Sequence, residues 1–445
     1  MTDITSPQSA GSEGSGSLAI SVDPALARKA AVAGFVGTAL EWYDYFLYGS
    51  AAALVFPTLF FNGMGPGVAT LASLASFGVS FLFRPLGGFI FGHLGDRIGR
   101  KRALIMTLML MGGGSFLIGC LPTAAAIGVL APILLVILRA VQGVGLGGEW
   151  GGAATLVVEC APRDRRGLYA SSMQMGVPAG QLGSAGMVAL FALLPEDQFL
   201  SWGWRVPFLL SGVLVLVGLW VRSRLEETPQ FRAVEVTHKK QRMPIKEVLA
   251  GHWRSVVLLI FVQAGATIAY YLLTVYVLVY ITEHLGLPKS WGLTGILLGA
   301  AVELVMIPVW ARLSDKIGRR PVYALGTLVL ALYAFPFFAL LDTKSQWLVC
   351  LAIVIGLGVG HAPTSALNGA IYAEQFPARL RYSGSSIAYQ MSSVVAGAPA
   401  AIVAAWLVQT TGTSRAVSIY VLAGAVVSLV AVALLSETRQ RELEL

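Results

Sequence analysis

The sequence has 445 residues, of which 56% are hydrophobic and only 12% are charged, and its net charge is +8. An average soluble domain has about 25% charged residues, so this chain has too few to coat the roughly three soluble domains that its length would form. Its three cysteines and five histidines show no disulfide or metal-ligand spacing. The composition indicates a polytopic membrane protein without metal or cofactor. It excludes nucleic-acid-binding and disulfide-stabilised secreted proteins.

Twelve apolar segments follow a polar N-terminus. That N-terminus is rich in Ser, Gly, Thr and Asp and has no signal-peptide features, so we expect a disordered tail over residues 1–28. Each apolar segment is long enough to cross a bilayer, which takes about 20 residues. They lie at 29–56, 68–92, 103–121, 130–158, 169–194, 205–222, 255–282, 290–311, 321–341, 346–372, 384–409 and 415–436. The sequence therefore predicts an all-α membrane protein with twelve transmembrane helices.

The basic residues between these segments are unevenly distributed. One set of alternate loops, together with both termini, carries 25 Lys and Arg residues. The other set carries four, namely Arg205, Lys289, Lys344 and Arg415. Because cytoplasmic loops of membrane proteins are enriched in Lys and Arg, we predict a cell-membrane protein with both termini in the cytoplasm.

The chain also contains an internal duplication. The segment LGDRIGRK from Leu94 returns as LSDKIGRR from Leu313, and a Glu-x-x-Pro-x-x-x-Arg pattern begins at Glu159 and again at Glu374. The offsets of 219 and 215 residues are about half the chain, as expected for a repeated unit. We predict two pseudo-symmetric six-helix bundles over 29–222 and 255–436, a cytoplasmic central loop over 223–254 and a cytoplasmic tail over 437–445.

Several motifs resemble those of the major facilitator superfamily. The segment GHLGDRIGRK from Gly92 resembles its loop signature. Within the superfamily, five segments resemble motifs of the metabolite:proton symporter family. They are EWYDY at 41–45, FRPLGG at 83–88, GGEWGG at 147–152, SWGWRVPF at 201–208 and RYSG at 381–384. The resemblance covers about residues 30–436. It implies a major facilitator fold and a proton-coupled secondary transporter, not an enzyme, that works by alternating access.

The resemblance leaves two classes of substrate open. Similar family members carry shikimate, 2-oxoglutarate, citrate and other carboxylates, or proline and betaine. The first half is most similar to shikimate-type members, so we expect import of a small organic acid such as shikimate or a di- or tricarboxylate. A proline or glycine-betaine osmolyte transporter is the alternative, although osmosensing members have a long C-terminal coiled coil and this chain has about nine residues after its last predicted span. The expected partners are the acid, a proton and the lipid bilayer, without nucleic acid, and we expect a monomer.

Ionisable residues inside the predicted spans need a reason, because a charge at mid-bilayer costs at least about 3 kcal/mol. Asp44 in the first span and Arg139 in the fourth lie at compatible depths. An aspartate that meets an arginine takes up a proton more readily when the arginine moves away. In proton-coupled sugar porters of the superfamily, an aspartate and an arginine at these motif positions play this part. We predict Asp44 as proton carrier and Arg139 as its switch, with a permanent structural pair as the alternative and Glu41, one turn earlier, as another proton acceptor.

Other polar and aromatic residues in the spans are candidates for contact with the substrate, with ordinary helix packing as the alternative for each. They are Arg84, Tyr45, Gln142, Glu149, Gln263, Tyr271, Glu303, His361, Asn368 and Tyr389. Four acids and two arginines lie inside the spans, so an anionic substrate requires some of the acids to be protonated or paired.

Acids in the basic loops predict a gate. An acid beside Arg or Lys at a helix end can brace neighbouring helices in the state closed to the cytoplasm. We expect Glu159 to pair with Arg166 and Glu374 with Arg381. The gating candidates are Gly92, Asp96, Arg97, Arg100, Glu159, Arg166, Asp315, Arg319, Glu374 and Arg381. The alternative is that the basic residues act only as topology signals.

Overall fold

The computed structural model describes residues 24–224, 227–228, 231, 244–439 and 441–443. Most of the tail predicted at 1–28 and the middle of the central loop predicted at 223–254 lie outside the described residues. Within the described ranges the regular structure is entirely helical.

The first half of the chain supplies six long helices. They are α1 (Pro24–Leu54), α3 (Pro66–Ile98), α4 (Arg100–Cys120), α6 (Leu130–Cys160), α7 (Arg166–Phe191) and α9 (Arg205–Ser223). Short helices in the connections are α2 (Phe56–Leu59), α5 (Ala124–Ile127), η1 (Arg163–Arg165), α8 (Glu196–Gln198) and η2 (Phe199–Gly203).

In the second half, three of the six spans are interrupted by π-helical turns. The first span consists of α12 (Trp253–Tyr271), η3 (Leu272–Tyr276), α13 (Val277–Val279) and η4 (Tyr280–His284). It is followed by α14 (Lys289–Ile317) and α15 (Arg319–Asp342). The fourth span consists of α16 (Gln346–Ile355), η5 (Gly356–His361) and α17 (Ala362–Glu374). A short helix, η6 (Ala378–Leu380), leads to the fifth span, which consists of α18 (Arg381–Ser392), η7 (Ser393–Gly397) and α19 (Ala398–Thr411). The last span is α20 (Arg415–Leu434), and a short helix, α11 (Pro244–Gly251), precedes α12.

These helices confirm the predicted fold class. Ten helical segments of the described chain are long and apolar enough to cross a membrane. The remaining two long helices, α1 and α7, coincide with the first and fifth predicted spans. The clearest difference is at two helix ends, because α3 continues to Ile98 and α14 to Ile317. The helices are longer than predicted because the acid in each of these last turns, Asp96 or Asp315, finds partners inside the protein.

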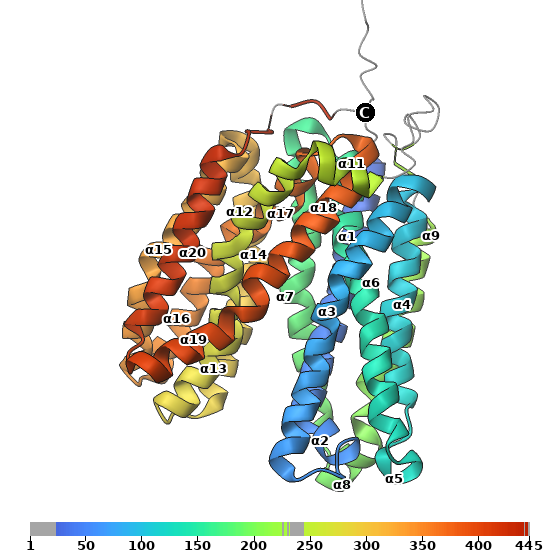
Figure 1. Cartoon of the computed structure of the whole chain (residues 1–445), viewed down its shortest axis with the longest axis vertical. Helices are drawn as coiled ribbons and strands as arrows, with labels where there is room; N and C mark the ends of the chain where they lie inside the picture. The colour runs from blue at the N-terminus through green and yellow to red at the C-terminus, as the bar shows by residue number, and fades with distance from the viewer. Residues whose placement is uncertain (1–23, 225–226, 229–230, 232–243, 440, 444–445) are drawn as a thin grey trace, which may run out of the picture.

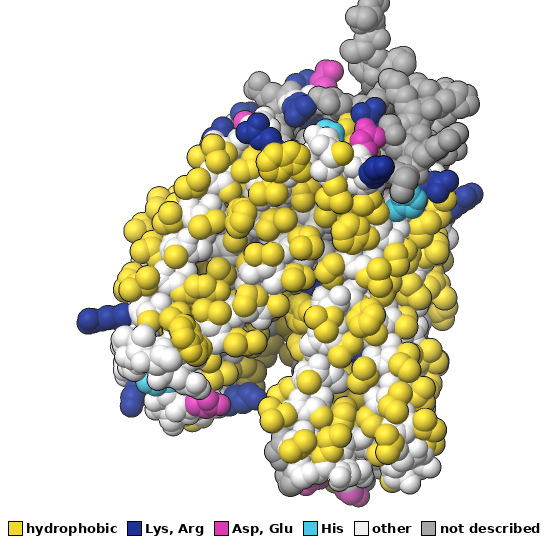
Figure 2. Space-filling view, in the orientation of Figure 1, with side chains coloured by type: hydrophobic (Ala, Val, Ile, Leu, Met, Phe, Trp, Pro, Cys, Tyr) yellow, Lys and Arg dark blue, Asp and Glu magenta, His cyan; other side chains and the backbone are white. Residues whose placement is uncertain are grey.

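The helices form two bundles, one from each half of the chain (Figure 1). In the first bundle α1 packs on α7, and α3 and α4 pack on α6; in the second, α12 and α15 pack on α20, and α14 packs on α16. The bundles touch where α7 meets α14 and α17 and where α18 meets α3 and α6. Figure 2 shows apolar side chains over most of the visible surface, with Lys and Arg concentrated at the upper end. We call that upper end the basic end; at the opposite end a hollow separates the bundles.

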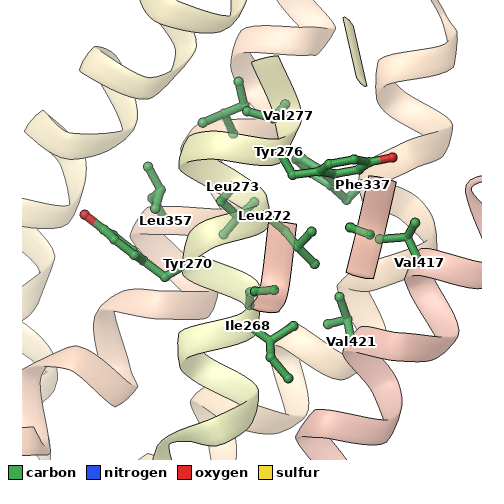
Figure 3. Packing of buried hydrophobic residues seen from close by; sticks show 14 of the residues in the cluster. Ile268, Tyr270, Leu272, Leu273, Tyr276, Val277, Phe337, Leu357, Val417 and Val421 are labelled. Carbon is green, nitrogen blue, oxygen red and sulfur yellow. The ribbon is translucent and has the colours of Figure 1, made fainter. Parts of the chain in front are cut away.

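The apolar core of the second bundle holds its first span in place. Residues of this span, among them Ile268 and Leu272, pack with Phe337 of α15 and Val421 of α20 (Figure 3). Tyr270 projects from the other side of the same helix. The cluster thus fixes the rotation of α12 about its axis and turns Tyr270 away from α20.

Helices α3 and α6 approach each other backbone to backbone. A Cβ atom at Gly87 would collide with the carbonyl oxygen of Val144, and one at Gly147 with the carbonyl oxygen of Arg84. Small residues permit such close contact between transmembrane helices. This contact fixes the position of Arg84 on α3.

Gly87→Ala should therefore destabilise the protein, because a backbone carbonyl cannot move aside as a flexible side chain can. Overpacking of this kind costs about 1–3 kcal/mol. The control is Gly78→Ala on the same helix, where a Cβ would meet nothing within 4 Å. Thermal unfolding in detergent should show a lower Tm for Gly87→Ala only. Equal Tm values for the two variants would contradict the close contact.

Candidate functional site

A cavity of ≈ 50 Å³ lies between the two bundles. Helices α1, α3 and α7 of the first bundle and α12, α17 and α18 of the second contribute to it. Its lining residues are Trp42, Arg84, Gln174, Val177, Gln263, Thr267, Tyr270, Tyr271, His361, Ser365, Asn368, Tyr389 and Ser393. Six of the ten residues predicted to contact substrate are among them, namely Arg84, Gln263, Tyr271, His361, Asn368 and Tyr389. These are six of the thirteen lining residues, and the sequence did not indicate Gln174, Thr267 or Ser365.

The π-helical turns of the second bundle adjoin this cavity. Tyr271 directly precedes η3, His361 is the last residue of η5, and Ser393 is the first residue of η7. A π-turn shifts the side chains around it relative to a regular helix, and such turns are frequent at functional sites. Here they bring residues of three different spans into one cavity wall.

Arg84 is a buried cation without a matching acid. Arg84 is 6% exposed. The Cζ atom of its guanidinium lies 4.6 Å from the ring centre of Phe81 and 5.0 Å from that of Tyr45. Among the described residues no carboxylate lies within ion-pairing distance of it, and its Nε has no hydrogen-bond partner. A buried charge left in this way is costly unless something else compensates it. The cavity therefore presents an anion-binding group, with Tyr45 behind it as support.

Further polar atoms in the cavity wall have no hydrogen-bond partner. They are Trp42 Nε1, Gln263 Oε1, Thr267 Oγ1, Tyr270 OH and Asn368 Oδ1. Buried polar groups in proteins are nearly always hydrogen-bonded. The wall thus offers donors and acceptors to a polar solute beside the guanidinium of Arg84.

Glu303 and His361 form a pair at the edge of the cavity. The Nδ1 atom of His361 lies 2.7 Å from Oε1 of Glu303. The ring of Tyr270 lies 4.8 Å from the imidazole. His361 belongs to the cavity wall, whereas Glu303 is 2% exposed behind it. The structure thus brings together two predicted substrate contacts, but only His361 faces the cavity.

Asp44 and Arg139 are not joined in an ion pair, and neither lines the cavity. The carboxylate of Asp44 accepts a hydrogen bond from Ser211 Oγ at 2.5 Å. Arg139 lies 4.1 Å over the ring of Tyr48 and donates to Gln142 Oε1 at 3.2 Å. The connection between them is indirect, because Gln142 donates to Ser115 at 2.7 Å and Ser115 neighbours the carboxylate of Asp44. Gln142 therefore positions Arg139 and does not reach the cavity.

Glu41 and Glu149 also lie outside the cavity wall. Glu41 is 5% exposed and its Oε2 has no hydrogen-bond partner. Glu149 is ion-paired with Arg222 and accepts a hydrogen bond from Thr107 Oγ1 at 2.6 Å. Arg222 is the last residue of the sixth predicted span, and its role as a buried counter-ion was missed from the sequence. Pairing of Glu149 with Arg222 and of Glu303 with His361 leaves Arg84 as the charge in the described cavity wall that lacks an opposite partner.

At the basic end a cluster of charges joins the two bundles. We call Asp96, Arg100, Glu159 and Arg381 the first clamp. Arg381 of the second bundle lies 2.6 Å from Glu159, which also pairs with Arg100 at 3.3 Å. Asp96 accepts hydrogen bonds from the backbone N–H groups of residues 382 and 383 at 3.3 and 2.9 Å, at the start of α18. Four charged side chains thus connect α3, α4 and α6 to α18.

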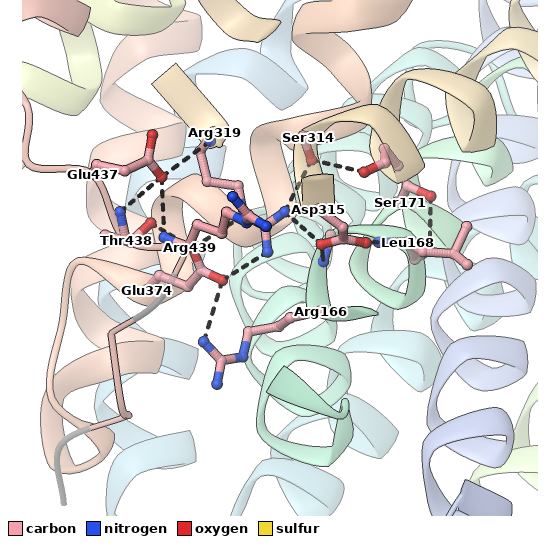
Figure 4. Close-up of polar contacts among 12 residues, drawn as sticks. Arg166, Leu168, Ser171, Ser314, Asp315, Arg319, Glu374, Glu437, Thr438 and Arg439 are labelled. Carbon is pink, nitrogen blue, oxygen red and sulfur yellow. Dashed lines mark hydrogen bonds and ion pairs between the residues drawn. The ribbon is translucent and has the colours of Figure 1, made fainter. Parts of the chain in front are cut away.

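The duplicated residues form an equivalent cluster, which Figure 4 shows. We call Asp315, Arg319, Glu374 and Arg166 the second clamp. Asp315 accepts hydrogen bonds from the backbone N–H groups of residues 167 and 168 at 2.8 and 2.9 Å. Arg319 lies 2.6 Å from Asp315 and 3.3 Å from Glu374, and Arg166 lies 3.4 Å from Glu374. The second clamp therefore connects α14, α15 and α17 to α7 of the first bundle.

The pairing expected from the sequence is corrected by these contacts. Glu159 pairs with Arg381 and not as expected with Arg166, and Glu374 pairs with Arg166. The reason is the pseudo-two-fold arrangement, which places the end of each fourth helix of a bundle against the start of the fifth helix of the other.

Two further gating candidates behave differently from each other. A Cβ atom at Gly92 would lie 2.9 Å from the Cα of Ser383, so this glycine allows α3 to approach α18. Arg97 is exposed and contacts His93 at 3.5 Å, and the structure does not bring it into either clamp.

A Glu-Thr pair after the last helix of each bundle completes each clamp. Glu227 accepts hydrogen bonds from the backbone N–H groups of residues 100 and 101 at 3.0 and 3.3 Å, and Thr228 donates to Glu159. Glu437 accepts from the backbone N–H groups of residues 319 and 320, each at 3.0 Å, and Thr438 donates to Glu374. Sequence reasoning missed both pairs, although their repetition 210 residues apart was a usable signal.

The environment of Glu437 favours its charged form. Burial would raise the pKa of this carboxyl, but hydrogen bonds from four backbone N–H groups outweigh it and hold the pKa below its ordinary value. A carboxylate at the start of α15 also complements the positive end of the helix dipole. Glu437 is thus an ionised helix cap at neutral pH.

The larger pocket of ≈ 250 Å³ at the basic end is a separate feature. His252, Glu374, Arg441 and Glu442 are among its lining residues. All of its wall comes from the second bundle and the segment after α20, so it does not lie between the bundles.

Comparison with known proteins matches this geometry to a family. The family model described as Major Facilitator Superfamily matches residues 34–401 and 290–444. The chain belongs to the major facilitator superfamily. The xylose symporter XylE, a solved major facilitator bound to 6-bromo-6-deoxy-D-glucose, shares the fold with a TM-score of 0.72 at 17% identity, covering 94% of this chain and 98% of that one.

Two curated relatives place the chain in the metabolite:proton symporter family of this superfamily. The shikimate transporter of Escherichia coli K12 is 44% identical over 93% of this chain and 95% of its own length. The glycine betaine/proline/ectoine/pipecolic acid transporter OusA of Dickeya dadantii is 35% identical over 95% of this chain and 86% of its own length.

Asp96→Asn should loosen the first clamp, because it removes a buried charge that accepts two hydrogen bonds from the other bundle. Such charge-assisted bonds are worth about 1.5–3 kcal/mol. We expect a cysteine introduced at Ser365, in a background without native cysteines, to react at least about tenfold faster with an impermeant maleimide applied at the basic end.

The matched control is Asp164→Asn, which changes an exposed acid at the same end. It should leave the labelling rate unchanged. Unchanged labelling in both variants would show that the first clamp does not hold this end closed.

Proposed function

We propose that this major facilitator is a proton-coupled symporter that imports a small organic acid by alternating access. The observation that carries the proposal is Arg84, a cation that lines the cavity between the bundles and has no acid within ion-pairing distance among the described residues. A substrate carboxylate would supply the missing charge through hydrogen bonds assisted by both charges.

A hydroxylated carboxylate such as shikimate suits the rest of the cavity wall. Gln263, Thr267 and Asn368 carry polar atoms without partners, and these can bind the hydroxyl groups of the substrate. The similarity to the shikimate transporter supports the same class. Di- and tricarboxylates fit Arg84 equally well but make less use of these neutral groups.

An osmolyte is the second candidate, and the aromatic residues of the wall favour it. Trp42, Tyr270, Tyr271 and Tyr389 line the cavity. Aromatic faces bind quaternary ammonium groups, and Arg84 would hold the carboxylate of glycine betaine or proline. The similarity to OusA supports this alternative.

The proposed orientation follows from the basic loops. Positive loops favour the cytoplasmic side, so the basic end faces the cytoplasm, with both termini there, in the cell membrane. The clamps then close the cytoplasmic end, and the hollow in Figure 2 opens outward. Transport requires the bundles, 29–222 and 255–436, to rock about the cavity as two units within a monomer.

An uptake panel tests the substrate. Cells that express the protein receive radiolabelled shikimate, 2-oxoglutarate, citrate, proline or betaine at two external pH values, with and without a protonophore. We expect a carboxylate to accumulate more at the lower pH and the protonophore to abolish this. Arg84→Gln should reduce its uptake about 10- to 100-fold, because a charged hydrogen-bond partner is lost, whereas Arg97→Gln should not. Accumulation of only proline or betaine would favour the osmolyte transporter.

Asp44→Asn tests the proposed proton carrier. Without a carboxyl that can bind and release a proton, uphill uptake should be abolished while exchange of labelled for unlabelled substrate continues. Counterflow in proteoliposomes measures the exchange and also shows that the variant is folded. Full accumulation by this variant would remove Asp44 from the coupling mechanism.

A further inference from the structure

We propose that Glu303 and His361 are a second proton site, which sets the affinity of the cavity for its anionic substrate. A proton from the outside solution binds the imidazole, and the resulting imidazolium holds the substrate carboxylate together with Arg84. This inference rests on the proposed function and adds to it a site that changes charge at the cavity itself.

The geometry of the pair leaves one ring nitrogen for the proton. Nδ1 of His361 is engaged by Glu303 Oε1 at 2.7 Å, so Nε2 is the nitrogen that remains. The imidazole belongs to the cavity wall and its side chain is 12% exposed, whereas the side chain of Glu303 is 3% exposed. A carboxylate that holds one nitrogen of an imidazole fixes the orientation of the ring and leaves the other nitrogen to face the cavity. His361 is therefore positioned to take a proton from the cavity.

The side chains around the pair include no second acid among the described residues. Helix α12 contributes Tyr270, whose ring lies 4.8 Å from the imidazole. The neighbouring helices α15 and α16 carry ionisable groups that are engaged elsewhere: Tyr333 donates to a backbone carbonyl at 3.1 Å, and the thiol of Cys350 is directed to the carbonyl of residue 291. Arg166, the charged residue of α7, lies in the second clamp.

The other ionisable groups of the cavity wall are Arg84 of α3, Tyr271 of α12 and Tyr389 of α18. Arg84 is a permanent cation, and the two tyrosines stay neutral at physiological pH. Protonation of His361 is thus the event that changes the charge of the cavity wall.

Position makes this charge change relevant to the substrate. Arg84 belongs to the first bundle and His361 to the second, and both line the same cavity. An anion bound between them contacts both bundles. Proton binding that raises the affinity for the anion must be matched by anion binding that raises the affinity for the proton. The two ligands therefore bind together without a covalent step, and the proton leaves Nε2 for water when the cavity opens to the less acidic side.

Asp44 does not provide this effect, because it lies outside the cavity wall between α1, α4 and α9. Its charge can bias the movement of the helices, but it cannot touch the substrate in the arrangement described here. The two sites are separable by experiment for this reason.

The test measures binding of radiolabelled shikimate, with 2-oxoglutarate and citrate in parallel, to the purified full-length protein between pH 5.5 and 8. The native protein should bind the carboxylate more tightly as the pH falls, by up to about tenfold per pH unit where one proton is taken up. A pH-sensitive dye in weakly buffered solution should report that proton. His361→Asn should bind with little dependence on pH and without proton uptake.

Two further variants make the result decisive. Asp44→Asn should keep the pH-dependent binding of the native protein, and Glu303→Gln, which retains the imidazole, should displace the pH profile. The inference is overturned if both His361→Asn and Glu303→Gln keep the native pH profile, or if Asp44→Asn alone abolishes it. Failure of the native protein to bind any of the three carboxylates at any pH would overturn the proposed function, and the inference with it.

Discussion

Buried charges that pair across the interface between the bundles are the constraint on which the closed basic end depends. Glu159 with Arg381 and Glu374 with Arg166 connect helices of opposite bundles. Removal of one partner from a buried pair costs about 3–5 kcal/mol. Each glutamate also keeps an arginine of its own bundle, Arg100 or Arg319. Separation of the bundles would therefore leave each glutamate with an arginine partner in its own bundle.

The duplication of the chain explains why there are two such clamps. Asp96 and Asp315 each cap the start of a helix in the other bundle, and Glu227 and Glu437 each cap a helix in their own bundle. Equivalent bonds therefore lie on both sides of the pseudo-symmetry axis and hold the basic end closed on both sides. The movement of whole bundles that alternating access requires would therefore have to release both clamps together.

The fold was predictable because each helix that crosses the bilayer needs a continuous apolar segment of about 20 residues. Apolar length gave the twelve spans, the repeat gave the two bundles, and the cost of a buried charge singled out Arg84. The ion-pair partners in the clamps were not predictable from sequence spacing. Glu159 and Arg166 are close in sequence, but the end of the fourth helix of each bundle faces the start of the fifth helix of the other bundle. Arg222 is at the very end of its predicted span and Gln174 carries no charge, so nothing in the sequence showed that these side chains turn inward.

A fixed arginine alone cannot drive accumulation of an anion. Arg84 is charged whichever way the cavity opens, and a group with equal affinity in both states shifts no equilibrium. Uphill transport needs a second group whose charge differs between the two sides of the membrane. Among the described residues of the cavity wall, His361 is the side chain to which the proposal above assigns this change. His361 belongs to the second bundle and Arg84 to the first, so in the proposed mechanism the proton and the substrate together favour contact between the bundles, and loss of either one weakens it.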